Sequence, residues 1–468
     1  MIGKTGWTYS PYKPFLFNTG DIYICRVVPG EFSIHFEWIG LDSNSEYTVY
    51  LRKKDDGNFE EICTVSDTFC DINGLVSDTD YEFYVSSGCL KSRVRIARTG
   101  KTIGVVVNYL HPDDMAYSFS GNYLCSPSMV RHPDGYLLAS MDVYGPHGPQ
   151  NLSIIFRSDD DGDTWHYVSE LMPCFWGKMF IHKKELYMMS CSTEYGDLLI
   201  GKSTDGGKTF TTPTVLMRGS CNSSQEYASQ GVHKSPMNIM VYNGRIYETL
   251  EWGSWYCGDY GHAAMIMSCD ENDDLLDAKN WHFTEPVVYN PEWPGVAKGP
   301  SRGNIEGTLC VSPDGVLYNV MRYEIYEKSE PSYGMVLAYR VNTDDPDAPL
   351  EYSHPIMFNG NLSKFLIKYD EKSEKYYSIV SRVDSMDRIG HRNLLSLLVS
   401  DDMENWKIKT DLYDFTDKDH NKVGLQYVDF DFEGDDILYL CRTAMNNANS
   451  YHNSNYITFH RIKNFRSL

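Results

Sequence analysis

Three arginines stand at the ends of predicted strands and indicate a site for an anionic ligand. Arg322, Arg382 and Arg442 each close an apolar run that follows a short turn. A guanidinium is planar and binds a carboxylate, sulfate or phosphate through two parallel hydrogen bonds. A single arginine is about as often paired with a neighbouring acid that only joins two parts of a fold. The interpretation therefore depends on whether the three arginines share one rim.

Other ionisable and aromatic residues occupy equivalent places, where an innermost strand starts or where the strand after it ends. A polar, charged ligand needs such groups to converge on one opening. These further candidates are Asp142, Trp176, Glu194, Tyr195, His233, Glu306, Lys364 and Tyr427. Taken alone, the histidine is as often a hydrogen-bonded structural residue, and most of the 35 tyrosines are expected to pack inside sheets.

The elements that would position these residues are six hairpins, each with two apolar runs around a short turn. Asp-Gly, Asn-Gly and related pairs between apolar runs are the strongest short-range hairpin signal. The hairpins fall about 45 to 70 residues apart, close to the length of a four-stranded propeller blade. They span residues 128–138, 179–188, 238–247, 308–318, 365–379 and 429–439. No helical periodicity of useful length competes with this interpretation.

Two segments, 158–165 and 203–210, repeat the pattern SxDxGxT followed by an aromatic residue. Asp160 and Asp205 stand where a side chain caps the backbone of a tight turn, and the glycine two places later permits positive φ. Degenerate copies follow at 268–281 and 400–406. The spacing differs from that of a twelve-residue calcium loop, and we identify no set of metal ligands.

We therefore predict an all-β protein in which residues 1–100 form a small sandwich and residues 101–468 form a six-bladed β-propeller. Alternation of apolar and polar residues predicts strands of the sandwich at 32–38, 47–51 and 81–85. With Trp38 in its core and Tyr81 as a corner tyrosine, the sandwich is similar to a fibronectin type III module. We interpret it as a spacer without a ligand of its own.

The Asp-centred repeats resemble the Asp boxes, or BNR repeats, of the sialidase superfamily, and the likeness covers most of residues 120–465. Glu306, leading through its hairpin to Arg322, is similar to the glutamate that assists the nucleophile and to one carboxylate-binding arginine of that family. Arg392 resembles a second such arginine. Tyr427 falls where these enzymes carry their catalytic tyrosine, and Asp142 falls near their acid/base aspartate.

The resemblance implies a retaining glycoside hydrolase that removes a terminal acidic sugar. A phenol with a pKa of about 10 is a poor nucleophile, so Tyr427 would need Glu306 to accept its proton. Asp142 would protonate the leaving oxygen and then activate water. Trp176, Trp252 and His233 would form walls that contact the sugar. The full set of expected substrate-binding residues is Arg322, Arg382, Arg392, Arg442, His233, Trp176, Glu194, Tyr195, Lys364 and His452.

The first blade departs from the family pattern. Cys125-Ser126-Pro127 replaces the Arg-Ile-Pro string of a sialidase, so a three-arginine grip would need Arg442 to contribute from another angle. Two alternatives stay open. One is a polysaccharide lyase that cleaves uronate-containing chains by β-elimination, for which the candidate acids and bases are His147, His233, Tyr195 and Tyr427. The other is a non-catalytic glycan-binding propeller.

The composition argues against several classes of partner. A net charge of -22, from 42 basic and 64 acidic residues, disfavours nucleic acid and anionic membrane surfaces. The sequence contains neither an apolar run of about 18 residues nor a signal-peptide pattern. Its 12 cysteines include no CxxC pair and fit reduced, buried thiols. We expect a cytoplasmic protein without a cofactor or membrane insertion, whose partner is an acidic oligosaccharide or polysaccharide.

Overall fold

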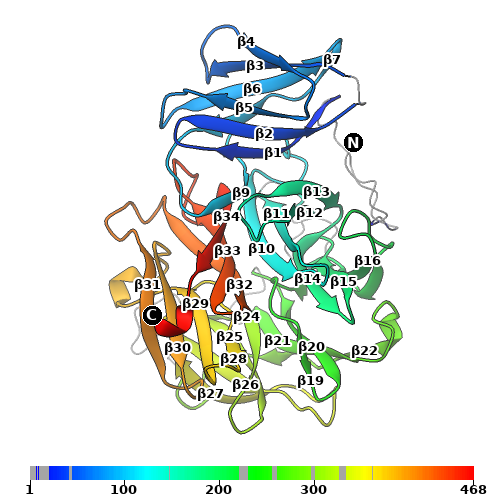
Figure 1. Cartoon of the computed structure of the whole chain (residues 1–468). Coiled ribbons are helices and arrows are strands. Elements are labelled where there is room, and N and C mark those ends of the chain that lie inside the picture. The colour runs from blue at the N-terminus through cyan, green and yellow to red at the C-terminus, as the bar shows by residue number, and fades with distance from the viewer. Residues whose placement is uncertain are drawn as a thin grey trace.

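The computed structural model describes residues 7, 9, 21–41, 45–146, 148–220, 230–255, 261–296, 301–325, 334–360 and 362–468. In these residues all regular structure is β, apart from three 3-10 helices: η1 (Ala278–Asn280), η2 (Met386–Arg388) and η3 (Phe465–Ser467). A two-sheet unit from the N-terminal part stands on a ring of sheets (Figure 1). The prediction of an all-β chain built around a propeller is confirmed.

The N-terminal unit packs one sheet of order β1-β2-β5 against a second of order β4-β3-β6-β7, in which β8 also pairs with β6. Its strands are β1 (Tyr23–Pro29), β2 (Ser33–Ile39), β3 (Tyr47–Lys53), β4 (Glu60–Val65), β5 (Phe69–Asn73), β6 (Asp80–Ser87), β7 (Leu90–Lys91) and β8 (Arg95–Arg98). In β2, buried Ile34, Phe36 and Trp38 alternate with more exposed residues, as expected for a strand with one buried face. The Tyr81 hydroxyl accepts a hydrogen bond from the Val76 N–H at 3.0 Å. Assignment of this sandwich to the fibronectin type III class stays a prediction.

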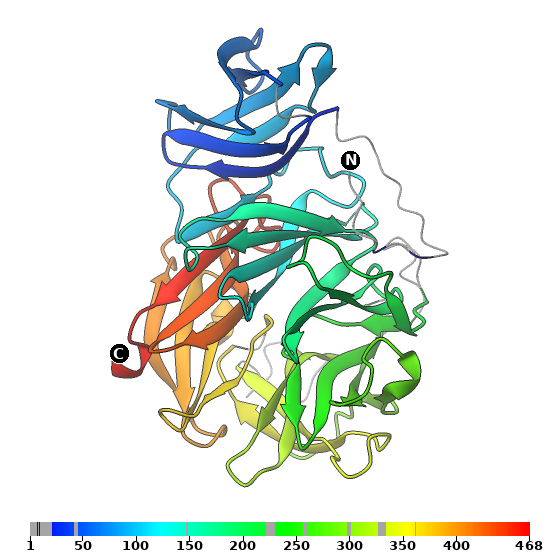
Figure 2. The same ribbon diagram turned by 45° about the vertical axis from the view of Figure 1, so that its right-hand side comes forward.

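The sandwich stands above the ring (Figure 2), and buried polar contacts join the two. Arg95 pairs with Asp114 at 2.6 Å and also donates to the Ile24 carbonyl at 2.7 Å. Arg26 donates to the carbonyl of Val107, in the strand β9 (Val105–Tyr109), at 2.9 Å. Such bonds are directional, so they fix the orientation of the sandwich more tightly than apolar packing alone would.

Blades 1 and 2 are four-stranded antiparallel meanders with the orders β10-β11-β12-β13 and β14-β15-β16-β17. Their strands are β10 (Tyr123–Arg131), β11 (Leu137–Tyr144), β12 (Leu152–Ser158), β13 (His166–Leu171), β14 (Phe175–His182), β15 (Glu185–Cys191), β16 (Leu198–Ser203) and β17 (Thr214–Met217). The two hairpins expected at 128–138 and 179–188 join the first and second strands of these blades.

Blade 3 has its first and last strands in two pieces each: β18 and β19 pair with β20, and β22 and β23 pair with β21. Blade 4 has the order β24-β25-β26-β27 and touches blade 3 through one parallel pairing, His262 with Gly303. The strands are β18 (Gly231–His233), β19 (Met240–Tyr242), β20 (Arg245–Gly253), β21 (His262–Asp270), β22 (Trp281–Phe283), β23 (Val287–Val288), β24 (Ser301–Val311), β25 (Leu317–Ile325), β26 (Met335–Arg340) and β27 (Glu351–Met357).

Blade 6 closes the ring with strands from both ends of the propeller segment. Blade 5 has the order β28-β29-β30-β31, and blade 6 has the order β32-β33-β34-β9. The strands are β28 (Lys368–Asp370), β29 (Lys375–Ser381), β30 (Leu394–Ser400), β31 (Trp406–Asp414), β32 (Gly424–Glu433), β33 (Asp436–Ala444) and β34 (Tyr456–Ile462). Tyr456 of β34 pairs with Tyr109 of β9, and Phe459 pairs with Val105. Because β9 precedes all other propeller strands in the sequence, this pairing joins the start of the propeller segment to its end.

The two Asp-centred turns have the same hydrogen bonds. The carboxylate of Asp160 accepts from the backbone N–H of Thr164 at 2.8 Å and from its hydroxyl at 2.6 Å. Asp205 accepts from the corresponding groups of Thr209 at 2.9 and 2.6 Å. The aromatic residue that ends the first pattern, Trp165, is fully buried. Each turn is therefore held by one carboxylate, and in the first turn the buried Trp165 side chain adds an apolar anchor.

We expect Asp160→Ala to lower the free energy of unfolding by about 1 to 2 kcal/mol, because the turn loses the acceptor of three hydrogen bonds, from Ser158 and Thr164. Urea denaturation followed by tryptophan fluorescence measures this change. Asp163→Ala is the matched control: within the described residues the Asp163 side chain makes no hydrogen bond, and its removal should change stability by less than 0.5 kcal/mol, as is usual on a surface. Equal effects of the two substitutions would contradict this account of the turn.

Candidate active site

A β-bulge recurs at one point in the innermost strands of four blades. Each strand has one extra residue there, and that residue is in the left-handed region: Ser126 (φ 52°), Trp176 (φ 55°), Glu306 (φ 58°) and Tyr427 (φ 54°). A bulge bends its strand and re-aims the side chain. Non-glycine residues with positive φ are uncommon and concentrate at functional sites. The same backbone bulge therefore orients one residue in each of four blades.

The preceding blade braces the bulge in three of these four cases. The N–H of Trp176 donates to Asp142 of blade 1 at 2.7 Å, and the N–H of Glu306 donates to Glu251 of blade 3 at 2.8 Å. The N–H of Tyr427 donates to the Ser363 hydroxyl, before β28 of blade 5, at 3.4 Å. Asp142 and Glu251 occupy corresponding places on the second strands of their blades. Neighbouring blades therefore hold the strained residues in place.

Tyr427, Glu306 and Arg322 form one hydrogen-bonded group although they come from blades 6 and 4. Arg322 Nη1 donates to Glu306 Oε2 at 2.6 Å and to the Tyr427 hydroxyl at 3.2 Å. The charge of Glu306 acts on Tyr427, and the other oxygen of this glutamate, Oε1, accepts from the Ser235 hydroxyl at 2.9 Å. The sequence prediction that these three residues meet is therefore matched by their contacts.

Burial and the neighbouring charges shift the pKa values of Glu306 and Tyr427 in opposite directions. Burial alone would raise the pKa of Glu306, but the charge of Arg322 and hydrogen bonds from Tyr427 and Arg322 lower that pKa to about 2. Burial and the charge of Glu306 raise the pKa of Tyr427 to about 12, against the opposing effect of the arginines. At neutral pH the pair is a carboxylate facing a neutral phenol.

Two further arginines lie over the Tyr427 ring. The guanidinium carbon of Arg442 is 5.0 Å from the ring centroid, and that of Arg392 is 5.7 Å away. Arg442 donates to the main-chain oxygen of His452, and that histidine shares a 2.9 Å hydrogen bond with the Tyr144 hydroxyl. Burial, followed by the charge of Arg442, holds the pKa of His452 well below its usual range, so its ring is neutral. Three arginines, including Arg322, thus surround one phenol.

Arg382 has different contacts from the three arginines around Tyr427. Its guanidinium donates to Ser396 at 3.0 Å and to Asp411 at 3.1 and 3.2 Å, and it also pairs with Asp384 at 3.3 Å. These partners belong to blade 5 itself. The contacts of Arg382 are those of a residue that joins strands, whereas Arg392, predicted from the family resemblance, is the blade 5 arginine beside Tyr427.

A second cluster of the candidate site is built around His233. Its Nδ1 lies 2.6 Å from Glu251 Oε2, and its ring packs against Trp176 with centroids 4.4 Å apart. The Tyr195 hydroxyl is 3.2 Å from His262 Nε2. Glu194 accepts a 2.9 Å hydrogen bond from Gln150, and burial raises its pKa. The predicted residues Trp176, Glu194, Tyr195 and His233 therefore form one cluster.

Asp142 has its carboxylate engaged inside the protein. The residue is 1% exposed, and its oxygens accept from the Ser153 hydroxyl and from the Trp176 N–H. Burial raises its pKa to about 7. These bonds are the brace of the blade 2 bulge, and we find in them no arrangement that points the carboxylate at a reacting sugar.

Below the site, buried lysines and acids occupy the inner strands. Lys178 pairs with Asp429 at 2.7 Å and Lys234 pairs with Glu248 at 2.7 Å. Lys364 is 1% exposed, and in the described part of the chain its ammonium group makes no hydrogen bond. It belongs to this buried layer rather than to the wall of the site.

Sequence reasoning left Glu251, Tyr144 and His262 without a role. Glu251 follows the third hairpin, where the sequence does not distinguish it from other acids at the ends of strands. His147, a candidate of the lyase alternative, lies outside the described residues.

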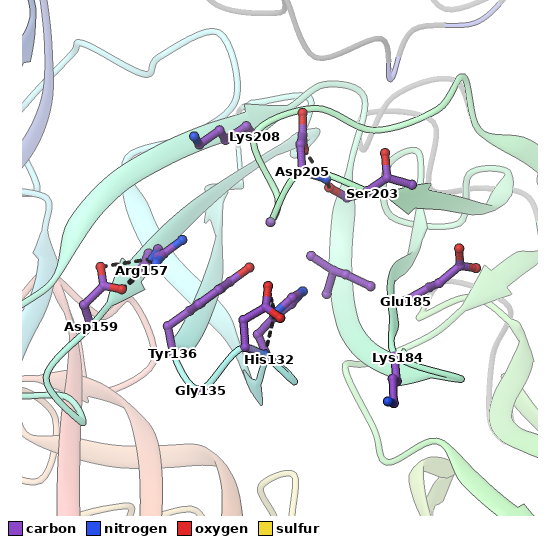
Figure 3. A pocket seen from close by; sticks show the side chains of 14 residues that line it. His132, Gly135, Tyr136, Arg157, Asp159, Lys184, Glu185, Ser203, Asp205 and Lys208 are labelled. Atoms are coloured by element: carbon purple, nitrogen blue, oxygen red, sulfur yellow. Dashed lines mark hydrogen bonds and ion pairs between the residues drawn. The ribbon is translucent and has the colours of Figure 1, made fainter.

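A separate hollow of about 620 Å³ opens between blades 1 and 2, at the hairpin end of their strands (Figure 3). Its Tyr136 ring lies between Arg157, whose guanidinium carbon is 3.6 Å from the ring centroid, and His132, whose ring is stacked 4.4 Å away. Arg157 is in turn paired with Asp159. Both faces of the tyrosine are covered, so this hollow offers no open aromatic platform for a sugar.

Within the ranges that the structure describes, no three His, Cys, Asp or Glu side chains are placed to hold a metal ion. No helix in the same ranges is long and apolar enough to cross a bilayer.

No protein-family model and no curated protein sequence matches this chain. Solved structures do match its fold. An α-L-arabinanase from Penicillium chrysogenum complexed with arabinobiose is 14% identical and covers 78% of this chain and 99% of its own, with a TM-score of 0.52. An α-L-arabinofuranosidase from Fusarium graminearum with an iminosugar inhibitor is 14% identical, with coverages of 77% and 97% and a TM-score of 0.50. A sialidase from Streptococcus pneumoniae is 8% identical, with coverages of 95% and 93% and a TM-score of 0.46.

We expect Lys364→Met to raise the midpoint of thermal unfolding, and to do so more at pH 6 than at pH 9. Burial lowers the pKa of Lys364 to about 7, whereas an unfolded lysine titrates near about 10.4. Below about pH 7 the amine is charged in both states, so the full penalty of burying the charge applies; that penalty shrinks as the pH rises toward about 10.

Lys178→Met is the matched control, because it leaves the buried Asp429 without its ion-pair partner and should destabilise the fold by about 3 to 5 kcal/mol. Differential scanning calorimetry across the two pH values distinguishes the variants. A Lys364→Met protein that is no more stable than the parent at pH 6 would refute the assignment of an unpaired buried amine.

Proposed function

We infer that the protein is a glycoside hydrolase that removes a terminal acidic sugar by a retaining mechanism, with Tyr427 as nucleophile. The observation that carries this inference is the group formed by Tyr427, Glu306 and Arg322, with Arg392 and Arg442 over the phenol ring. A phenol, a carboxylate that could act as its base and three cations thus meet in one group. The similar fold of two glycan-processing enzymes agrees with this proposal.

The chemistry follows from the charges. Tyr427 attacks the anomeric carbon while its proton passes to Glu306, and the bond to the leaving oxygen breaks. A sugar that carries a carboxylate next to this carbon repels an anionic nucleophile, whereas a neutral phenol avoids that repulsion; tyrosine is the known exception among glycosidase nucleophiles. Water then releases the sugar from Tyr427 with its anomeric configuration retained.

The arginines favour an acidic substrate despite the net charge of -22. Arg442 supplies the guanidinium that the Cys125-Ser126-Pro127 segment of blade 1 lacks, but it does so from blade 6. We propose an acidic sugar without committing to sialic acid, and neutral arabinosides belong in the test panel because a fold neighbour binds arabinobiose.

A polysaccharide lyase is the second candidate, and the observation that favours it is the His233–Glu251 pair across from Tyr427. Arginine would neutralise a uronate, and tyrosine and histidine would serve as acid and base of the elimination. Mass analysis of digested glycans separates the two reactions, since elimination leaves an unsaturated product and hydrolysis adds water. Binding without any turnover would instead support a glycan-binding propeller.

Tyr427→Phe should lower kcat at least about 1,000-fold with little change in the thermal unfolding midpoint. Glu306→Gln should lower kcat by a similar factor and should also lower the midpoint, because it leaves the buried Arg322 without its ion-pair partner. Phenylalanine has no nucleophilic oxygen, and glutamine cannot accept the proton. Turnover of a panel of acidic and neutral glycans, measured by mass spectrometry, checks the change. Unaltered turnover in either variant contradicts the site.

Arg442→Gln should raise KM for an acidic glycoside by about 10- to 100-fold, the effect of losing one charge-assisted hydrogen bond, and should leave any neutral substrate nearly unaffected. Arg382→Gln is the control, because that side chain already pairs with Asp411. Steady-state kinetics on matched acidic and neutral glycosides gives the comparison. Equal effects of the two substitutions would remove Arg442 from the binding site.

A further inference from the structure

His233 is held in one orientation by contacts on several sides. Its Nδ1 is 2.6 Å from Glu251 Oε2, and both side chains are at most 3% exposed. The ring lies against Trp176, with centroids 4.4 Å apart, and against His262, at 4.9 Å. Across the residues that the structure describes, Nε2 makes no hydrogen bond. It is also not one of the fully buried polar atoms that lack a partner. The imidazole therefore has one anchored nitrogen and one nitrogen available for proton transfer.

Glu251 connects this histidine to the nucleophile's base. One of its oxygens accepts from the backbone N–H of Glu306 at 2.8 Å, and the other binds His233. A single carboxylate thus fixes the imidazole and the strained backbone of Glu306 at the same time. Movement of either group would break a bond to the same side chain, so the spacing between the two is fixed.

We propose that His233 is the general acid and base of the reaction, and that Glu251 is its positioning residue. The proposal rests on the glycoside hydrolase function inferred above. In the first step the Tyr427 oxygen bonds to the anomeric carbon, the Tyr427 proton goes to Glu306, and the proton on His233 Nε2 goes to the departing oxygen. In the second step water attacks the same carbon and gives a proton to Nε2, while the bond to Tyr427 breaks and the Glu306 proton returns to the phenol.

The charges around the imidazole favour its protonated form. Burial alone lowers the pKa of His233, but the hydrogen bond and charge of Glu251, followed by the charges of Glu306 and Glu194, raise it above its usual value. Glu194 reaches the histidine from the loop after β15, Glu251 from β20 and Glu306 from β24, while the His262 ring faces it from β21. The acid form needed to protonate a leaving group is thus stabilised from several blades.

The two other acids of the site fit this role less well. Asp142 has its oxygens bound to Ser153 and to the Trp176 N–H, which is the same bracing that Glu251 gives Glu306. Glu194 is hydrogen-bonded to Gln150 at 2.9 Å, and it lies where its charge supports His233. Both are therefore comparison variants in the test.

The decisive experiment compares His233→Asn with Asp142→Asn and Glu194→Gln on glycosides with good and poor leaving groups. The probes are 4-nitrophenyl and methyl glycosides of N-acetylneuraminic acid and glucuronic acid. A 4-nitrophenolate leaves without a proton, whereas methanol needs one. His233→Asn should therefore lower kcat/KM for the methyl glycoside at least about 100-fold, the usual effect of a general acid. For the 4-nitrophenyl glycoside, the rate of the first, bond-breaking step should fall less than about 10-fold.

His132→Asn, in the hollow of Figure 3 on the other side of the ring, is the matched histidine control and should leave both rates unchanged. Equal losses on both probes in His233→Asn, or a selective loss in Asp142→Asn or Glu194→Gln instead, would overturn the assignment of His233. Failure of the unaltered protein to hydrolyse any of these probes or the glycan panel would instead overturn the proposed function itself.

Glu251→Gln tests positioning separately. Glutamine can still accept from the Glu306 N–H, but it removes the negative charge beside the imidazole. The pKa of His233 should fall by one unit or more, seen both in imidazole NMR shifts and as a shift of the alkaline limb of the rate profile to lower pH. An unchanged His233 titration in this variant would contradict the role of Glu251.

Discussion

Closure of the ring is the constraint on which the site depends. His233, Glu306 and Tyr427 lie on blades 3, 4 and 6, and they meet only because β9 pairs with β34 and completes the last blade. Without that pairing, β34 would present an open edge and the blades would be free to spread. The same pairing leaves β9 beside the sandwich, where Arg26 binds its Val107 carbonyl.

The repeated bulge converts this closed ring into a chemical site. A left-handed non-glycine residue costs of order 1 to 3 kcal/mol and persists only when its surroundings hold it. Here the surroundings are the side chains of the preceding blade, such as Asp142 for Trp176 and Glu251 for Glu306. Because one blade supplies the acceptor and the next supplies the strained residue, the geometry of the mouth is a property of blade contacts and not of single hairpins.

Local charge at the mouth opposes the charge of the whole protein. The chain carries a net charge of -22, yet Arg322, Arg392 and Arg442 converge on one phenol. Arg322 is also the partner that keeps Glu306 ionised. Under the proposed function, the arginine that would bind the anionic ligand is therefore also the one that keeps the base ionised.

The sequence by itself determined the all-β class, the hairpins and the Asp-centred turns, because turn residues and alternating apolar runs act over a few neighbouring positions. It also indicated Glu306, Arg322, Arg392 and Tyr427, through local strings that resemble a known family. The boundary at residue 100 and the fibronectin assignment of the sandwich remain predictions.

Which rim residues lie together depends on contacts between distant segments of the chain. Arg382 and Arg442 have the same local pattern, but Asp411 engages the first and Tyr427 lies beside the second. Three other polar residues also differ in their partners. Asp142 accepts from the Trp176 N–H of the next blade, and Glu251 accepts from the Glu306 N–H of the next blade. Within the described residues, the Lys364 amine has no hydrogen-bond partner. The role of a polar side chain depends on partners that ring closure brings from distant segments, and short-range sequence patterns carry no information about those partners.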